Sequence, residues 1–182
     1  VKTKGITDQK SSGRCWLFTG LNVLRARMID KYNLGAFTFS QNYIFFYDQL
    51  EKANLFLQGV IDTRTLPFDD RQVDWLFSNP LSDGGQFTGV SDLVMKYGLV
   101  PADVMPETYS SNNTTQMAAQ LKNILRQGGL KLRSVYDGSG VASMKGKKAE
   151  AAEAKVNAEL QNVKESVLSD VYRVLALCLG VP

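Results

Sequence analysis

The sequence predicts a mostly helical chain, and three observations carry that prediction. Apolar residues recur at spacings of three and four in several segments between residues 17 and 127, which is the pattern of amphipathic helices. The segment from Ala149 to Leu179 is rich in Ala, Glu, Lys and Leu, residues of high helix propensity, and predicts one long helix. No internal repeat and no clear strand pattern interrupt these segments, so a mostly α architecture is expected.

The composition is that of an ordinary globular chain. With 182 residues, of which 44% are hydrophobic and 21% charged, the chain can form one substantial core, which excludes disordered and fibrous classes. No apolar run is long enough to span a membrane, so no membrane partner is expected. The chain starts at Val1 without a methionine and without the apolar stretch of a signal peptide. We therefore expect the native N-terminus to lie outside this sequence.

The first predicted helix follows Cys15 and extends to Ile29. Four residues at helical spacing form its apolar stripe: Leu17, Leu21, Leu24 and Met28. Arg25, Arg27 and Asp30 fall off this stripe, as expected for a helix with one face on the core.

Two further helices are predicted before residue 80. Ser40 is a suitable N-cap for a second helix that continues toward Leu57 through a segment dense in aromatic residues, which indicates burial. A third, shorter helix is predicted over Phe68–Leu76, and Asn79-Pro80 ends it because a proline disfavours helical geometry in the residue before it.

Helical patterns resume after the loop that carries Gly84 and Gly85. A fourth helix is predicted over Thr88–Tyr97, with Gly98 at its C-terminus. A fifth is predicted over Thr114–Gln127, and the pair Gly128-Gly129 is expected to stop it. Small, flexible and basic residues from 137 to 148 then lead into the long terminal helix.

Cys15 stands at the start of the first helix. A thiol on the first turn of a helix experiences the positive end of the helix dipole and unpaired N–H groups, which favour the thiolate. Gln9, six positions earlier, can fold back across a Ser/Gly loop so that its amide and the Cys15 N–H point at a developing oxyanion. A single cysteine before a tryptophan is usually a core residue, but this combination predicts a nucleophile, Cys15, with an oxyanion hole that includes Gln9.

Residues 9–16, QKSSGRCW, resemble the active-site segment of the papain-like cysteine peptidases, in which a Gln and a Ser/Gly loop precede a Cys followed by Trp or Tyr. The segment departs from that pattern at Arg14, where Ser or Ala is usual. It also departs at Ser12, where secreted members carry a disulfide cysteine, and the partner position of that disulfide corresponds to Ser82. Serine at both positions is typical of a reducing compartment, so a cytoplasmic location is expected.

Further segments resemble, in the same order, the branch that includes bleomycin hydrolase and aminopeptidase C. They are 39–43, 96–101, 105–110 and 172–180. The resemblance covers nearly the whole chain and is weakest from Val135 to Val163. It implies an α+β papain-like fold of which this chain is mainly the helical lobe, residues 1–134, followed by a flexible loop and a long helical insertion over 135–182. The second, sheet-containing lobe is absent from this chain.

The resemblance also implies the function. It implies a cysteine aminopeptidase that removes N-terminal residues from peptides through an acyl-enzyme on Cys15, with Gln9 holding the oxyanion. Gly84 and Gly85 would offer backbone groups to an extended substrate, although paired glycines also mark ordinary turns. Trp16 would pack beneath the site as a supporting residue.

The catalytic His and Asn of the family belong to the second lobe, and this chain has no histidine. The alternative function is therefore a catalytically inactive papain-like scaffold that serves binding or assembly. Two cysteines far apart and no histidine give no metal site, and no cofactor is expected.

Peptide substrates are the expected partners, and the resemblance implies a homohexamer. A net charge of +3 does not by itself indicate nucleic acid, although lysines such as Lys145, Lys147 and Lys148 leave that partner open. Most basic runs of this kind are solvated loops.

Four other residues could have a functional role or a purely structural one. Arg14 either helps to hold the thiolate or is simply solvated. Cys178 lies among leucines near a helix end, so buried packing is expected. Asn157 and Asn162 lie where a simple papain-like chain would carry its His and Asn, but their Ala/Glu/Lys-rich helix predicts that they are exposed.

Overall fold

The computed structural model describes residue 3 and residues 5–182, and the chain divides into two compact units. The first unit comprises the residues up to Gln49, Ser82–Ala119 and Val174–Pro182, and the second comprises Leu50–Leu81 and Gln120–Arg173. The predicted division of the chain at residue 134 stays a prediction.

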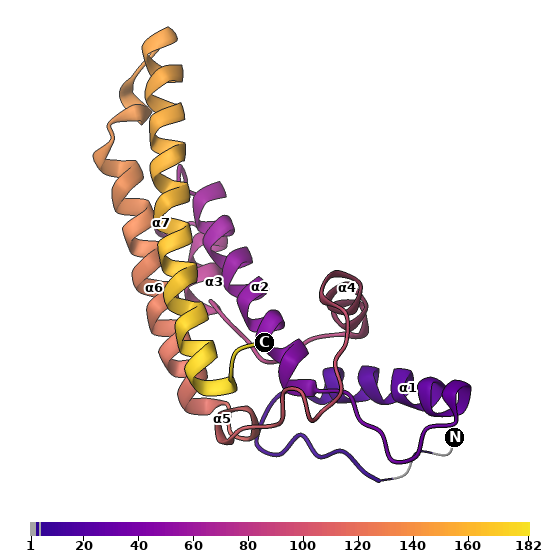
Figure 1. Cartoon of the computed structure of the whole chain (residues 1–182). Coiled ribbons are helices and arrows are strands. Elements are labelled where there is room, and N and C mark those ends of the chain that lie inside the picture. Colours follow the sequence, from indigo (N-terminus) through magenta and orange to yellow (C-terminus); the bar gives the residue numbers. More distant parts are fainter. Residues whose placement is uncertain (1–2, 4) are drawn as a thin grey trace. The chain divides into compact units, whose positions relative to one another are not determined.

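The chain folds into helices, as the apolar spacing predicted (Figure 1). In chain order the elements are α1 (Cys15–Tyr32), α2 (Gln41–Asp62), α3 (Arg71–Ser78), α4 (Phe87–Tyr97), α5 (Tyr109–Asn112), α6 (Thr115–Gly138), the 3₁₀ helix η1 (Val141–Ser143) and α7 (Lys147–Leu179). In the described part of the chain, strand-like pairing is limited to two isolated bridges, Ser11 with Asn113 and Phe39 with Pro101. No helix in that part is both long and apolar enough to cross a membrane.

Helix α1 positions the predicted nucleophile, because Cys15 is its first residue. It packs against α4 within the first unit through Gly20, where a Cβ would lie 2.7 Å from the Val90 side chain, so only glycine permits this approach. The helix ends at Asn33, whose φ of 50° is the left-handed C-cap conformation that asparagine tolerates.

The predicted stripe of α1 is correct for Leu17 and Leu21, which are buried. Arg25, expected off the stripe, is instead buried: its guanidinium donates to the Gly5 carbonyl at 3.1 Å and to Thr38 Oγ1 at 3.3 Å. These hydrogen bonds compensate a charge that would otherwise be expensive to remove from water. Leu24 and Met28 are half-buried.

Local capping signals predicted two of the helix boundaries. Ser40 caps α2, since its Oγ accepts from the Tyr43 N–H at 3.0 Å, and Gly98 ends α4 with a φ of 75°. Helix α3 starts at Arg71 rather than at the predicted Phe68. The reason is that the Asp70 side chain accepts from the Gln72 N–H and acts as the N-cap.

The prediction that Gly128 and Gly129 stop a helix is wrong, because α6 continues to Gly138. A Cβ on Gly128 would lie 2.7 Å from Val167, and one on Gly129 would lie 2.9 Å from Phe77. Both glycines therefore permit close side-chain packing inside the second unit instead of ending the helix.

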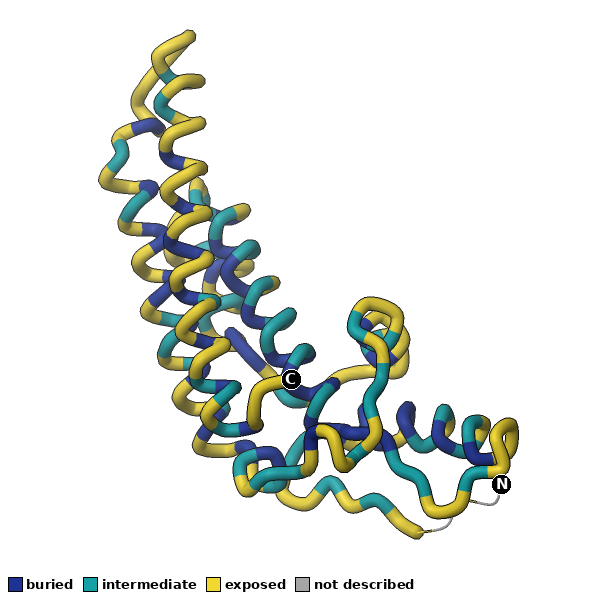
Figure 2. The backbone as a smooth tube through the Cα atoms, in the orientation of Figure 1, coloured by how far each residue is buried: buried dark blue, intermediate teal, exposed yellow. Residues whose placement is uncertain are grey.

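The long terminal helix is confirmed as α7. Within the second unit, buried and exposed residues alternate along α6 and α7 with a helical period (Figure 2). The predicted connection over residues 137–148 is shorter than expected, because α6, η1 and α7 occupy most of it.

Candidate active site

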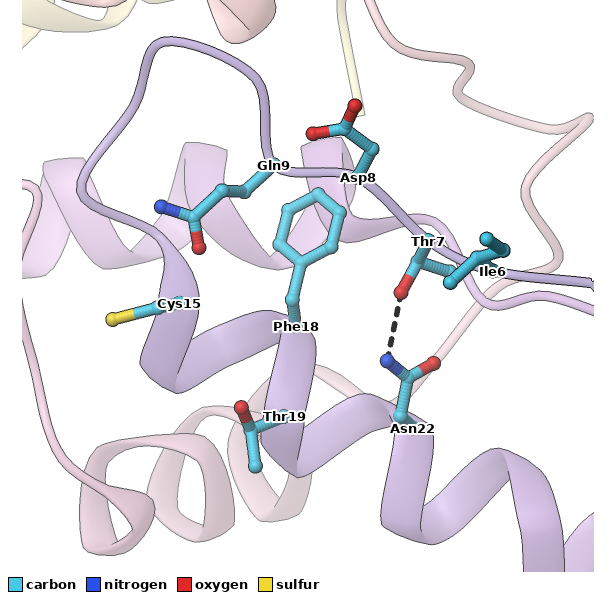
Figure 3. A pocket seen from close by; sticks show the side chains of 8 residues that line it. All are labelled: Ile6, Thr7, Asp8, Gln9, Cys15, Phe18, Thr19 and Asn22. Atoms are coloured by element: carbon cyan, nitrogen blue, oxygen red, sulfur yellow. Dashed lines mark hydrogen bonds between the residues drawn. The ribbon is translucent and has the colours of Figure 1, made fainter.

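A cavity of about 460 Å³ opens beside the start of α1, within the first unit. Its walls come from the N-terminal segment and the first turns of α1: Ile6, Thr7, Asp8, Gln9, Cys15, Phe18, Thr19 and Asn22 (Figure 3). Cys15 is exposed, and the cavity gives it access to a ligand. The structure thus brings the two predicted residues, Cys15 and Gln9, to one cavity.

The Gln9 side chain extends from its segment toward the side of the pocket on which Cys15 lies (Figure 3). Gln9 Nε2 donates to the Ser12 carbonyl at 2.6 Å. A primary amide has two N–H donors, so one remains for a ligand. An amide N–H that reaches the carbonyl oxygen of a bound substrate is the element from which an oxyanion hole is built.

The loop between Gln9 and Cys15 is held in an unusual conformation. Lys10 has a φ of 54°, in the left-handed region that residues with a side chain rarely adopt. Ser12 Oγ closes the turn by donating to the Gln9 carbonyl at 2.6 Å. Ser11 extends the restraint, since its N–H donates to the Asn112 carbonyl at 3.0 Å. A local hydrogen bond and a contact from a distant segment therefore restrain the loop.

Asp83 organises the same loop, a role that the sequence did not predict. Its Oδ2 accepts from the Gly13 N–H at 2.7 Å and from Thr114 Oγ1 at 2.8 Å. A Cβ on Gly13 would lie 2.4 Å from Asp83 Oδ1, so the contact requires glycine. The available signal was an acidic residue directly before a glycine pair.

Trp16 is buried, and its Nε1 donates to the Asp83 carbonyl at 2.9 Å. A Cβ on Gly85 would lie 2.7 Å from the Trp16 indole, whereas one on Gly84 would meet only Ser82 Oγ, at 3.4 Å. The packing of Trp16 thus accounts for glycine at 85 but not at 84. The substrate-binding role of this pair and the supporting role of Trp16 stay predictions.

Arg14 is not solvated, so that interpretation is wrong. The side chain is fully buried, with its guanidinium 5.0 Å from the ring centre of Phe18 and 5.1 Å from that of Phe45. It forms a bidentate ion pair with Glu107, at 2.8 and 3.2 Å. A fully buried arginine is rare unless it is paired in this way.

Asp8 is one of the residues that line the cavity, and its carboxylate pairs with Lys10. The Lys10 ammonium, 2.9 Å from Asp8 Oδ2, and the Lys10 backbone N–H hold the pKa of this exposed carboxyl below its ordinary value.

The remaining candidate residues do not line the cavity. Asn157 and Asn162 are exposed on α7, as predicted. Cys178 is half-buried rather than fully buried, because it lies near the end of α7, where its carbonyl accepts from Thr108 Oγ1. Lys145, Lys147 and Lys148 are exposed in the second unit.

Known proteins resemble the chain over its whole length. A bacterial aminopeptidase C, from Lactobacillus delbrueckii subsp. lactis, is 40% identical over 182 residues and is matched over 100% of this chain and 37% of its own length. Human bleomycin hydrolase is 36% identical, over 98% of this chain and 36% of its own length. The chain thus spans little more than a third of these relatives.

The crystal structure of PepW from Lactobacillus rhamnosis is also similar, with a TM-score of 0.85 and 38% identity, over 100% of this chain and 37% of that structure. This match confirms the predicted fold class, the mainly helical lobe of an α+β papain-like protein. The family model for the peptidase C1-like family matches residues 1–182. The chain therefore belongs to the peptidase C1-like family.

Proposed function

We propose that this chain supplies the nucleophile-bearing lobe of a cysteine aminopeptidase. The observation that carries the proposal is the placement of an exposed thiol, Cys15, on the first turn of α1 in one cavity with the Gln9 amide. The names of the relatives, aminopeptidase C and bleomycin hydrolase, favour hydrolysis at a peptide N-terminus.

In the proposed reaction Cys15 Sγ, as the thiolate, attacks the carbonyl carbon of the scissile amide. The carbonyl π electrons move to oxygen, and the oxyanion accepts from the free Gln9 N–H and from the Cys15 backbone N–H. Collapse of this intermediate breaks the C–N bond, and the amine leaves with a proton from a general acid. In the family that acid is a histidine of the second lobe, outside this chain. Water then hydrolyses the thioester and regenerates the thiol.

The proposal includes peptide substrates and a cytoplasmic location. Ser12 and Ser82 stand where secreted relatives of papain would carry a disulfide, and both serine hydroxyls make hydrogen bonds here, Ser12 to the Gln9 carbonyl and Ser82 from the Gly84 N–H. A chain without that disulfide suits a reducing compartment. Hexamer formation and contact with nucleic acid stay predictions.

The test uses the full-length protein that contains this chain. Hydrolysis of aminoacyl nitroanilides is measured together with labelling by an epoxysuccinyl probe, located by peptide mass spectrometry. We expect rapid labelling of Cys15, and loss of hydrolysis in Cys15→Ala. The matched control is Cys178→Ala, which removes the other cysteine and should retain wild-type hydrolysis.

Equal, slow labelling of Cys15 and Cys178 would contradict activation of the thiol. Wild-type protein that hydrolyses no aminoacyl or peptide substrate would favour the alternative, an inactive papain-like scaffold for binding or assembly.

A further inference from the structure

Arg14 precedes the nucleophile, and all sides of its buried guanidinium are engaged. Nη1 and Nη2 donate to the two carboxylate oxygens of Glu107, at 3.2 and 2.8 Å, and Nε donates to Ser12 Oγ at 2.9 Å. Arginine is the side chain that can make such a planar, three-point contact, because its donors stand in a fixed fork.

Ser12 forms hydrogen bonds with both Arg14 and Gln9 and so connects the two residues. Its Oγ accepts from Arg14 Nε and donates to the Gln9 carbonyl at 2.6 Å, while its own carbonyl accepts from Gln9 Nε2 at 2.6 Å. The hydroxyl therefore fixes the backbone of Gln9, and the carbonyl fixes its side-chain amide.

Glu107 is anchored at the other end. Its Oε2 also accepts from Ser111 Oγ at 2.7 Å, and Ser111 belongs to the capping box that starts α5 after Thr108. Because this cap orders residues 108–111, the carboxylate meets Arg14 from a rigid support. The series Ser111, Glu107, Arg14, Ser12 and Gln9 is then continuous in hydrogen bonds.

We propose that Arg14, Glu107 and Ser12 are positioning residues that hold the Gln9 amide in the geometry required by the oxyanion. This inference rests on the proposed function. A buried ion pair that served stability alone could be replaced by apolar residues with little or no loss. The third contact, from Arg14 Nε to Ser12, lies outside the ion pair and restrains a loop in which Lys10 has an unfavourable φ of 54°.

The test is a double-mutant cycle between Ser12 and Gln9 in the full-length enzyme. Gln9→Ala should lower kcat by about 10²- to 10³-fold, as loss of an oxyanion donor does. Ser12→Ala should lower kcat by roughly tenfold to a hundredfold, with KM changed less than about twofold, because it misplaces a group that acts in the transition state. In the Gln9→Ala background, Ser12→Ala should change kcat less than about twofold.

The matched control is Ser11→Ala. Ser11 is the exposed neighbour, and the contacts that the structure gives it are made by its backbone, so kcat should not change. Arg14→Lys is the second variant, because it keeps the charge opposite Glu107 and loses the donor to Ser12. It should show the same fall in kcat and the same non-additivity with Gln9→Ala.

Two results would overturn the inference: wild-type kcat in both Ser12→Ala and Arg14→Lys, or effects of these variants that multiply fully with that of Gln9→Ala. Where Ser12→Ala does not fold, Arg14→Lys decides alone. Failure of the proposed function itself is distinguishable, since it appears as wild-type protein that hydrolyses no substrate, or as a Cys15→Ala variant that keeps its activity, before any positioning variant is compared.

Discussion

Gly85→Ala separates the packing role of the glycine pair from its proposed role in binding substrate. Neither Gly84 nor Gly85 has a positive φ, so the backbone accepts alanine at both positions. The new methyl group at 85 would lie 2.7 Å from Cδ2 and Cε2 of the Trp16 indole. A rigid, buried ring cannot yield as a flexible side chain can, so either the loop or the indole must move.

The magnitude follows from these contacts. Forcing a methyl group into a packed site destabilises by about 1 to 3 kcal/mol. Movement of the indole would also weaken the hydrogen bond from Trp16 Nε1 to the Asp83 carbonyl, a bond of the kind that contributes about 0.5 to 1.5 kcal/mol. We expect Gly85→Ala to lower the free energy of unfolding by about 1.5 to 4.5 kcal/mol.

Gly84→Ala is the matched control. Its methyl group would meet only Ser82 Oγ at 3.4 Å, an ordinary contact, so its stability should equal or slightly exceed that of the wild type. Thermal unfolding of the full-length enzyme measures both variants, and Gly85→Ala should lower Tm by at least about 2 °C. Equal Tm values for the two variants would refute the packing argument. A raised KM in Gly84→Ala, at unchanged Tm, is the result expected if substrate approaches this backbone closely.

Two other predictions concern the cavity wall and the second unit. Lys10→Met should raise the pKa of the Asp8 carboxyl toward its ordinary value, since the ammonium contact is the largest cause of the lowering; an NMR titration that shows no rise would contradict this. The small stabilisation that this contact gives is present above the unfolded pKa and is lost as the pH falls through the folded one. Gly128→Ala should destabilise by up to about 2 kcal/mol, because its clash with Val167 outweighs the gain in helix propensity of about 1 kcal/mol. Urea titration measures the free energy of unfolding of this variant and of the control Gly138→Ala. The control should be neutral or stabilising, because its methyl group meets nothing within 4 Å. Equal losses of stability in the two variants would argue against close packing at Gly128.

Helices α1, α4 and α7 could be predicted because their signals are local. The apolar stripe that starts at Leu17 lies within α1, and Gly98 directly follows α4 as its C-cap. The glycine pair at 128–129 gave a wrong helix end because the deciding contacts are not local. Two glycines predict a helix end from local conformational freedom, but here the close packing of Val167 and Phe77 decides that they remain inside α6. Those contacts come from other segments and leave no local pattern.

The candidate site also contains residues with local signals and residues whose roles depend on distant partners. Cys15 and Gln9 could be identified together because one short loop joins them, so their spacing is visible in the sequence. Asp83 and Glu107 could not, since their partners Gly13 and Arg14 lie 70 and 93 positions away. A carboxylate that organises a distant loop has no spacing to detect.

The arginine at position 14 departs from the family pattern, and its distant partner Glu107 explains how the fold accommodates it. Ser or Ala is usual at this position in the papain-like peptidases that residues 9–16 resemble, and a guanidinium in that place needs both space and an opposite charge. Phe18 and Phe45 enclose it, and Glu107 supplies the charge. Returning the position to serine would leave a buried cavity and a carboxylate without its cation, which is among the more destabilising changes in a protein interior. A substitution of Arg14 therefore requires a compensating substitution of Glu107. Arg14 is one member of a buried ion pair and not a surface substitution.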